Sequence, residues 1–256
     1  MHREKIIVKK ALLSVSDKTN LLALAQQLHQ LGVEIISTGG TAQVLHEAKI
    51  PHQSVSQITE FPEMMDGRLK TLHPKIHGAI LGLRDQHQEQ AHAYKIPWID
   101  LVVVNLYPFI EKTRQQCSFE EMIENIDIGG PALLRAAAKN MSWVGVVVDP
   151  QEYENIIHVL THEGSIDFQL RQNLARKAFE HTAAYDRCIY EYLRQQQDAM
   201  PQKGIIDQEQ YDLKLVRVKK LRYGENPQQK AALFSSNSLG YGIAQARALQ
   251  GKAWST

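Results

Sequence analysis

The chain has 256 residues, of which 43% are hydrophobic, so it can bury one large core or two ordinary ones. Its 29 lysine and arginine residues balance 28 aspartate and glutamate residues, which excludes a global basic field for nucleic acid or membranes and leaves only locally assembled anion sites. The two cysteines, Cys117 and Cys188, form no CxxC pair, so neither a disulfide framework nor a zinc site is indicated. With a charged start and no apolar run of signal-peptide or membrane-spanning length, we expect a cytoplasmic protein.

The first half of the chain alternates predicted strands and helices. Residues 8–15 predict a strand, residues 20–38 a helix followed by a second strand, and residues 39–50 another helix. The β-branched runs within residues 98–109 and 143–150 are typical of strands buried on both faces. This pattern predicts an α/β fold with a mostly parallel sheet flanked by helices.

The second half is predicted to be helical and then to change character. Residues 118–140 predict an acidic helix, a Gly-Gly-Pro turn and an alanine-rich helix with Pro131 in its first turn. Residues 151–197 predict helix throughout. Because the polar stretch that follows has Pro and Gly but no apolar period, we expect one domain of residues 1–199 and a short segment of residues 200–256.

Hydroxyl side chains, a lysine and two glycines follow the first two predicted strands. In α/β sheets, ligands gather at the carboxyl ends of the strands, where backbone amides at helix starts attract anions. Glycines there let the amides approach a phosphate closely. The residues concerned are Ser14, Ser16, Lys18, Ser37, Thr38, Gly39, Gly40 and Thr41.

Each of these two motifs, taken alone, favours a helix cap rather than a ligand site. Ser16 or Asp17 would cap the first helix, and Ser37 or Thr41 the second. Two such ends on successive strands favour the phosphate site instead. Neither a P-loop nor a GxGxxG motif is present, so a phosphomonoester is expected rather than a nucleoside triphosphate or a dinucleotide.

Residues 60–82, EFPEMMDGRLKTLHPKIHGAILG, show no helix or strand period and are rich in glycine and cations. A long loop of this kind can supply the positive charge that a phosphate needs. If the loop is extended, Arg68 and Lys70 point the same way while Leu69 packs beneath them. The alternative is a solvated surface loop.

Two histidines in the same segment, His73 and His77, lie four residues apart. We expect Pro74 to interrupt the helix that would align them, and no acidic third ligand is close in sequence. The sequence therefore predicts no metal site here.

The later strand and helix ends offer groups for proton transfer. Asn105 and Tyr107 follow the third long strand, Asp127 precedes the Gly-Gly-Pro turn, and Lys139 ends the alanine-rich helix. Beside a phosphate site, an Asp, a Lys and a Tyr could perform general acid–base chemistry on a phosphorylated metabolite. Simpler roles stay open: a cap for Asp127, a helix-dipole contact for Lys139 and core packing for Tyr107.

Six ordered motifs extend this interpretation to a family. They are SVSDKT, STGGTA, DGRLKTLHPKIHG, NLYPF, ENIDIGGPALLRAAAKN and LRYGENPQQ. Together they resemble the bifunctional AICAR transformylase/IMP cyclohydrolase family over essentially the whole chain. The resemblance implies that residues 1–199 form an IMP cyclohydrolase domain with a methylglyoxal-synthase-like fold. Such a domain closes FAICAR to IMP with loss of water, without a cofactor, and works as a homodimer.

The resemblance also implies the site residues. Phosphate and ribose contacts would be Ser16, Asp17, Lys18, Thr38, Gly39, Gly40, Thr41, Arg68, Lys70 and Thr71, and the base would lie near Asn105, Leu106, Asp127, Ile128 and Gly129. Lys139 would match the family's proton-transfer lysine. Our hypothesis is that Asp127 receives or orients the carboxamide N–H while Lys139 or Lys70 protonates the departing oxygen, assisted by Tyr107.

Residues 200–256 resemble the opening of the transformylase half, which has a cytidine-deaminase-like fold and uses 10-formyltetrahydrofolate. Arg222 and Tyr223 would contact the AICAR phosphate and ribose. Because the rest of that half is absent, no transformylase activity is expected from this chain alone. The competing readings are a methylglyoxal-synthase-like lyase acting on a sugar phosphate and a nucleotide-sensing regulatory domain.

Overall fold

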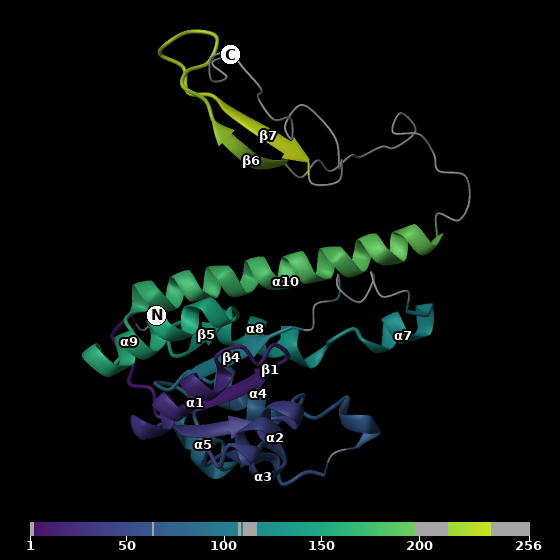
Figure 1. Cartoon of the computed structure of the whole chain (residues 1–256). Coiled ribbons are helices and arrows are strands. Elements are labelled where there is room, and N and C mark those ends of the chain that lie inside the picture. Colours follow the sequence, from purple (N-terminus) through teal and green to yellow (C-terminus); the bar gives the residue numbers. More distant parts are fainter. Residues whose placement is uncertain (1–2, 63, 107–108, 110–116, 198–214, 237–256) are drawn as a thin grey trace. The chain divides into compact units, whose positions relative to one another are not determined.

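The computed structural model describes residues 3–62, 64–106, 109, 117–197 and 215–236. The chain divides into two compact units, Met1–Gln196 and Gln197–Thr256 (Figure 1). This division falls close to residue 200, where the sequence predicts a boundary.

A five-stranded parallel sheet forms the centre of the first unit. Its strands lie in the order β3-β2-β1-β4-β5, and every neighbouring pair is parallel. The strands are β1 (Lys10–Val15), β2 (Glu34–Ser37), β3 (Gln53–Ser54), β4 (Leu101–Asn105) and β5 (Gly145–Val147). The expected α/β fold with a parallel sheet is confirmed, and the two-residue β3 is the strand that the sequence pattern did not predict.

The register of the strands explains why their sequences are so apolar. Leu12 of β1 pairs with Ile36 of β2 on one side and with Val102 of β4 on the other, and all three are fully buried. Helices cover both faces of the sheet, so neither face of a central strand meets water. β4 consequently has five buried residues in a row.

The helices of the first half have short, amphipathic sequences. In α1 (Leu21–Gln30), the buried residues are spaced at three and four positions, which is the period of one helix face. The others are α2 (Gly39–Glu47), α3 (Val55–Thr59), α4 (Pro74–Leu81) and α5 (Gln88–Ala93), with a 3₁₀ turn at Met65–Gly67.

Helix α4 corrects the expectation that residues 60–82 have no regular structure. Pro74 begins the helix instead of interrupting it, because the first turn of a helix tolerates a residue without an N–H. His73 is the N-cap and its Nδ1 accepts the Lys75 N–H at 3.1 Å, while His77 lies within the helix.

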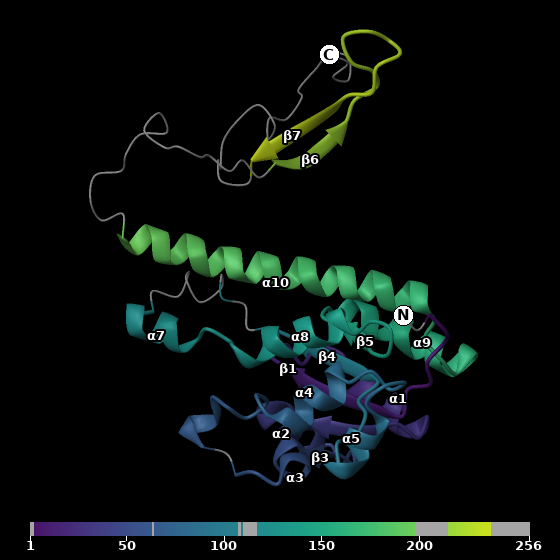
Figure 2. The same ribbon diagram turned by 180° about the vertical axis from the view of Figure 1, so that it is seen from behind.

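The second half of the first unit is mostly helical, as predicted, but residues 151–197 are not one helical stretch. The helices are α7 (Phe119–Glu124), α8 (Gly129–Lys139), α9 (Tyr153–Glu163) and α10 (Phe168–Gln197), with a 3₁₀ turn at Pro150–Glu152. Gly164 ends α9 in the left-handed conformation, with φ of 65°. Helix α8 packs on β4 and β5 and against α4, and α10 runs beside α8 and α9 (Figures 1 and 2).

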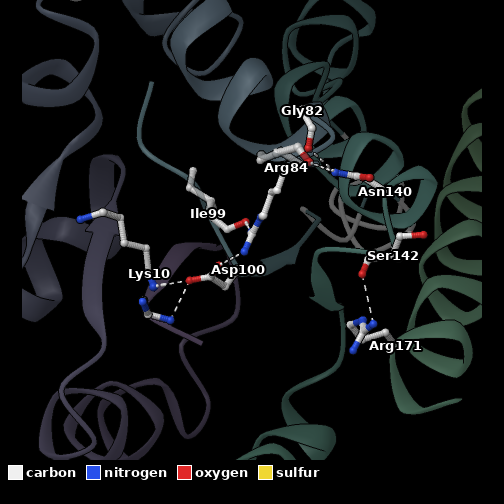
Figure 3. Close-up of polar contacts among 10 residues, drawn as sticks. Lys10, Gly82, Arg84, Ile99, Asp100, Asn140, Ser142 and Arg171 are labelled. Atoms are coloured by element: carbon white, nitrogen blue, oxygen red, sulfur yellow. Dashed lines mark hydrogen bonds and ion pairs between the residues drawn. The ribbon is translucent and has the colours of Figure 1, made fainter. Parts of the chain in front are cut away.

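Buried charges hold the amino ends of the strands together (Figure 3). Asp100, just before β4, accepts the backbone N–H groups of Lys9 and Lys10 and forms an ion pair with Arg84 at 2.6 Å. The guanidinium of Arg171 is fully buried and donates to four backbone carbonyls. These four acceptors are Glu4, Met141, Ser142 and Ile166.

The described part of the second unit is an antiparallel hairpin of β6 (Leu215–Lys220) and β7 (Ala232–Ser236). Its large apolar side chains stay exposed, including Val218 at 52% and Phe234 at 49%. Across the described residues, no helix combines the length and the apolar composition that crossing a bilayer needs.

Candidate active site

A cleft of about 480 Å³ opens at the carboxyl edge of the sheet, where the strand order reverses between β1 and β4. Such switch points are where open α/β sheets bind ligands. The cleft is lined by Ser14, Thr38, Gly67, Arg68, Lys70, Thr71, Val104, Ile123, Glu124, Ile126, Asp127, Ile128, Gly129, Gly130 and Leu133. Eight of the residues predicted from the sequence are among them: Ser14, Thr38, Arg68, Lys70, Thr71, Asp127, Ile128 and Gly129.

One wall of the cleft is the amino end of α2. Thr38 is the N-cap without a side-chain cap bond, and its hydroxyl lies 2.7 Å from that of Ser14. The first amides of a helix have no carbonyl partner within it and carry the positive end of its dipole. Gly39 has φ of +41°, and the Lys70 ammonium lies 3.5 Å from the point where its Cβ would be. This wall combines amide, hydroxyl and ammonium donors, which suits a phosphate.

The opposite wall is the amino end of α8, where two glycines allow close packing. A Cβ on Gly129 would lie 2.6 Å from the Thr71 hydroxyl, and one on Gly130 would collide with the Asp127 carboxylate. The segment 67–71 therefore touches both helix ends, through Lys70 at α2 and through Thr71 at α8. Two helix amino ends and a cationic segment face the same cleft.

The cationic segment is folded differently from the expectation. Arg68 has helical dihedrals and residues 68–71 form turns, so the extended arrangement is wrong. Leu69 is 42% exposed and faces a separate depression beside Phe61 and His73, so it does not pack beneath its neighbours. The turn nevertheless directs both cations to the cleft.

Arg68 forms an ion pair with Glu124, the last residue of α7. Both side chains are more than 60% exposed, so this pair is worth little in stability. Glu124 also lines the cleft, so its carboxylate would compete with a bound anion for the Arg68 guanidinium.

Asp127 combines a capping bond with an unusual electrostatic environment. Its Oδ1 accepts the Gly130 N–H at 2.8 Å, although the N-cap of α8 is Ile128, so Asp127 binds the first turn from one position before the cap. Burial disfavours the charged carboxylate and raises its pKa above the ordinary value, while the Gly130 and Gly129 amides act in the opposite direction. A carboxyl group with a raised pKa is suited to general acid–base chemistry near neutrality.

Several predicted phosphate contacts instead hold strand β1 to its neighbours. Ser37 is fully buried and donates to the Leu13 carbonyl, and the Thr41 hydroxyl bonds both the N–H and the carbonyl of Val15. The expected caps are wrong as well: Thr38 is the N-cap of α2, and Asn20 that of α1. These hydroxyls shape the sheet edge and do not face the cleft.

Lys18 lies beneath the α2 wall. Its ammonium donates to the Val15 carbonyl and, at 3.3 Å, to the Thr41 hydroxyl. Burial lowers its pKa, since a partly desolvated ammonium is less stable. Lys18 is absent from the described lining of the cleft and contributes charge from below.

Four other predicted contacts line a neighbouring depression of about 630 Å³. They are Ser16, Asp17, Asn105 and Leu106, which lie there with Val148, Asp149, Pro150, Lys177, Glu180, His181 and Ala184. Asn105 Oδ1 accepts the N–H groups of Ser16 and Asp17, which ties the loop after β1 to the end of β4. The structure thus divides the predicted substrate contacts between two hollows.

Lys139 lies at the other end of α8 from Asp127. The helix has 11 residues, so its two ends are about 15 Å apart. Lys139 faces a third hollow together with His77, Arg135 and Phe179. As the last residue of α8, it fits the helix-dipole alternative.

Three further predicted residues cannot be placed in this cleft. Tyr107 lies outside the described residues. Arg222 and Tyr223 belong to the loop that joins β6 and β7 in the second unit. Within the described part of the chain, no group of three or more His, Cys, Asp or Glu side chains is arranged to hold a metal ion.

Sequence reasoning missed two residues that matter to the geometry of the cleft. Glu124 pairs with Arg68 across 56 positions, and the hydroxyl of Tyr185 accepts the Asp127 N–H across 58 positions. No local motif marks either residue, because Glu124 is one of several glutamates in α7 and Tyr185 is one buried aromatic residue in α10. Only a knowledge of which helices are neighbours could have identified them.

Comparisons with known proteins agree with this architecture. Residues 20–132 match the family model of the MGS-like domain, so the first unit is a methylglyoxal-synthase-like α/β domain, as expected from the sequence. Residues 137–256 match the model of the AICARFT/IMPCHase bienzyme, a match that begins inside α8. The chain belongs to the family of bifunctional purine biosynthesis enzymes that combine AICAR formyltransferase with IMP cyclohydrolase.

Individual relatives give the extent of the likeness. The chain is 48% identical over 249 residues to the bifunctional purine biosynthesis protein PurH of Bacillus subtilis (strain 168), which covers 96% of this chain and 48% of that protein. It is 50% identical over 250 residues to PurH of Lactococcus lactis subsp. cremoris (strain MG1363), covering 95% and 47%. It therefore spans about half the length of these relatives. A crystal structure of ForH superposes with a TM-score of 0.64 at 33% identity, covering 72% of this chain and 98% of that one.

Proposed function

We propose that the first unit is an IMP cyclohydrolase, which closes the pyrimidine ring of FAICAR to give IMP and water. The observation that carries this proposal is the convergence of the α2 and α8 amino ends, the 67–71 segment and Asp127 on one cleft. Membership in the purine biosynthesis family supplies the substrate class.

The phosphate of the substrate would bind at the α2 wall. The amides of Gly39 and Gly40, the hydroxyls of Ser14 and Thr38, and the Lys70 ammonium offer donors of the kind that a dianion requires. Binding there would direct the imidazole and its two substituents toward the α8 wall.

Ring closure needs a deprotonated carboxamide nitrogen, a protonated formyl oxygen and contact between the two groups. Holding two preset groups together accounts for as much as ~7–11 kcal/mol of such a reaction. Asp127 would accept or orient the carboxamide N–H, and Lys70 would donate to the oxygen that leaves as water. The raised pKa of Asp127 strengthens it as a base.

Lys139 is still a predicted proton donor, but it could act on the substrate only if it reached the cleft of another copy of the chain. About 15 Å of helix separates it from Asp127 in the same chain. In the predicted homodimer, the Lys139 of one copy would have to approach the cleft of the other. Mixing an Asp127→Asn variant with a Lys139→Ala variant would restore activity only in that arrangement.

The test is spectrophotometric conversion of FAICAR to IMP by the purified chain. We expect turnover in the wild type and a loss of about 10²- to 10⁴-fold in kcat for Asp127→Asn. Asn keeps the size of the side chain and an oxygen for the Gly130 N–H, so folding should be unaffected.

Asp149→Asn is the matched control, because Asp149 caps a 3₁₀ turn and faces the neighbouring depression. It should keep wild-type rates. Equal losses in both variants would mean that the cleft at Asp127 is not specifically the site of the reaction. Turnover of dihydroxyacetone phosphate would favour a lyase, and IMP binding without FAICAR conversion would favour a nucleotide sensor.

The other activity of the family, formyl transfer to AICAR, needs 10-formyltetrahydrofolate. We propose that Arg222 and Tyr223 contact the AICAR phosphate and ribose, as the resemblance implies. The described hairpin exposes its side chains and is too small to enclose a folate by itself. Cyclohydrolase chemistry without a cofactor, a homodimer and a cytoplasmic location complete the proposal.

A further inference from the structure

The backbone of Asp127 is anchored by a residue that no motif identifies. Its N–H donates to the Tyr185 hydroxyl at 2.8 Å. Tyr185 lies in α10, far along the chain, and is only 7% exposed. Helix α10 is therefore hydrogen-bonded to the connection between α7 and α8 at Asp127 itself.

Asp127 lies in an irregular connection between two helices. The segment between Glu124 and Gly129 contains no regular element and leads into two glycines. Ile128, after Asp127, is 63% exposed and provides no apolar anchor, whereas Ile126, before it, packs against the core. The bond from Asp127 Oδ1 to the Gly130 N–H moves with the segment, because it is local. Among the described residues, the Tyr185 bond joins the Asp127 backbone to a buried side chain of a distant helix, and Ile126 packs against the core beside it.

The position of Tyr185 is fixed by packing. Its ring meets the Phe109 ring edge-on, with centroids 6.3 Å apart and planes at 75°. A phenylalanine could make the same ring contact, but it has no oxygen to accept the Asp127 N–H. Packing in the core therefore accounts for the ring of Tyr185, whereas its hydroxyl is accounted for by the bond to Asp127.

We infer that Tyr185 is a positioning residue for the reaction: by accepting the Asp127 N–H, it holds the carboxylate at the α8 wall in register with the substrate bound at the α2 wall. The inference rests on the proposed function. Tyr185 acts through Asp127 and does not line the described cleft. A misplacement of about 1 Å can cost up to ~100-fold in rate when two groups must meet.

Tyr192 provides a matched control on the same helix. Its ring also packs edge-on against Phe109, at 5.6 Å and 83°, and stacks on Phe119. Removing its hydroxyl tests the loss of a tyrosine oxygen from this aromatic cluster while the oxygen that accepts the Asp127 N–H is kept.

The experiment compares the wild type, Tyr185→Phe and Tyr192→Phe in the full chain. Measurements are kcat and KM for FAICAR across pH, with urea unfolding to show that each variant is folded. For Tyr185→Phe we expect kcat to fall about 10- to 100-fold with KM within twofold, since the α2 wall is untouched. Tyr192→Phe should stay within twofold in both constants.

The pH profile gives a readout that a purely structural role would not change. Of the titratable groups that the structure describes, Arg68, Lys70 and Glu124 share the cleft with Asp127, and Tyr185, which is itself near Asp186, approaches Asp127 from α10. Released from Tyr185, the Asp127 carboxylate should become better hydrated. The part of the kcat–pH curve that reports ionisation of Asp127 should therefore move to lower pH in Tyr185→Phe and stay in place in Tyr192→Phe.

Wild-type kcat and pH profile in a folded Tyr185→Phe, or equal losses in both variants, would overturn the inference. If Tyr185→Phe does not fold, hydrogen exchange in the wild type decides: an Asp127 amide exchanging as fast as its neighbours in the connection contradicts the anchor. If the wild type does not convert FAICAR, the proposed function fails. The anchor is then judged separately, by whether carbon NMR finds the Asp127 pKa lowered in Tyr185→Phe.

Discussion

The two ends of one parallel sheet use charged residues in opposite ways. At the amino ends, Asp100 and Arg171 are buried and every charge meets a partner or several backbone groups (Figure 3). At the carboxyl ends, Arg68 is exposed, Lys70 is half-buried, and the amino ends of α2 and α8 are directed at a cleft. The first arrangement stabilises the fold, and the second places donors at a cleft that a ligand can enter.

The difference follows from what each end has to satisfy. At the amino end, Arg171 donates to four buried or partly buried carbonyls, of which the Ile166 carbonyl also accepts the Ile6 N–H. At the carboxyl end, the helix amides can be satisfied by water until an anion replaces it. Substitutions at one end should therefore change stability, and those at the other end should change binding.

The largest effect is expected from Arg171→Leu at the amino end. It removes four side-chain bonds from buried or partly buried carbonyls, so the free energy of unfolding should fall by about 3–5 kcal/mol. Urea denaturation of the full chain measures this loss. Arg176→Leu, which breaks an exposed ion pair with Glu180, should change it by less than about 0.5 kcal/mol. Similar losses in the two variants would contradict the distinction.

Lys70→Met should show the converse behaviour at the carboxyl end. Met keeps much of the side-chain volume but removes the ammonium beside Gly39, so kcat/KM for FAICAR should fall about 10- to 100-fold. The urea midpoint should hardly move. Lys75→Met is the control, because Lys75 pairs with Glu60 away from the cleft. Loss of stability without loss of activity in Lys70→Met would assign this lysine to the scaffold.

Glu124→Gln should improve binding. Removing the carboxylate that pairs with Arg68 frees this guanidinium for the ligand, and an exposed pair of this kind is worth less than about 1 kcal/mol. The Kd for IMP should therefore tighten by about two- to fivefold at low salt, with the gain shrinking as salt is added. Calorimetric titration checks it. Weaker binding would show that Glu124 orients Arg68 instead of competing for it.

Asp127 should give the smallest signal, a slope in stability with pH. Its native pKa is raised above the ordinary 3.8, so the folded state holds the proton more tightly than the unfolded state. Wild-type stability should therefore decrease as pH rises from about 3.8 through the raised value. Asp127→Asn lacks this decrease. Urea midpoints at several pH values measure the difference, and parallel curves for the two proteins would contradict the raised pKa.

Much of the fold was predictable because its signals are local. The β-branched runs of β4 and β5 and the leucine spacing of α1 follow from burial on two faces or on one. The helix α4 was missed because Pro74 was read as a breaker, although a proline at the first helical position is favourable. The short β3 has too few residues for a period.

The sequence predicted several hydrogen-bond donors of the site, but it did not predict which groups each of them contacts. Thr38, Arg68 and Lys70 stand beside glycines and loop signals that mark a phosphate site, and all three line the cleft. Ser37 and Thr41 carry the same signals but turn toward strand β1. Nothing in a hydroxyl-rich motif tells which hydroxyl faces a neighbouring strand and which faces a ligand.

Local signals in the chain are enough to predict the βα alternation, the glycine-rich starts of α2 and α8 and the position of a cationic segment between them, because periodicity and backbone freedom are local properties. The packed fold alone reveals that the Tyr185 hydroxyl accepts the Asp127 N–H and that Glu124 pairs with Arg68. Those relations depend on which helices pack side by side and in which direction each runs, and residues more than fifty positions apart carry no local trace of that packing.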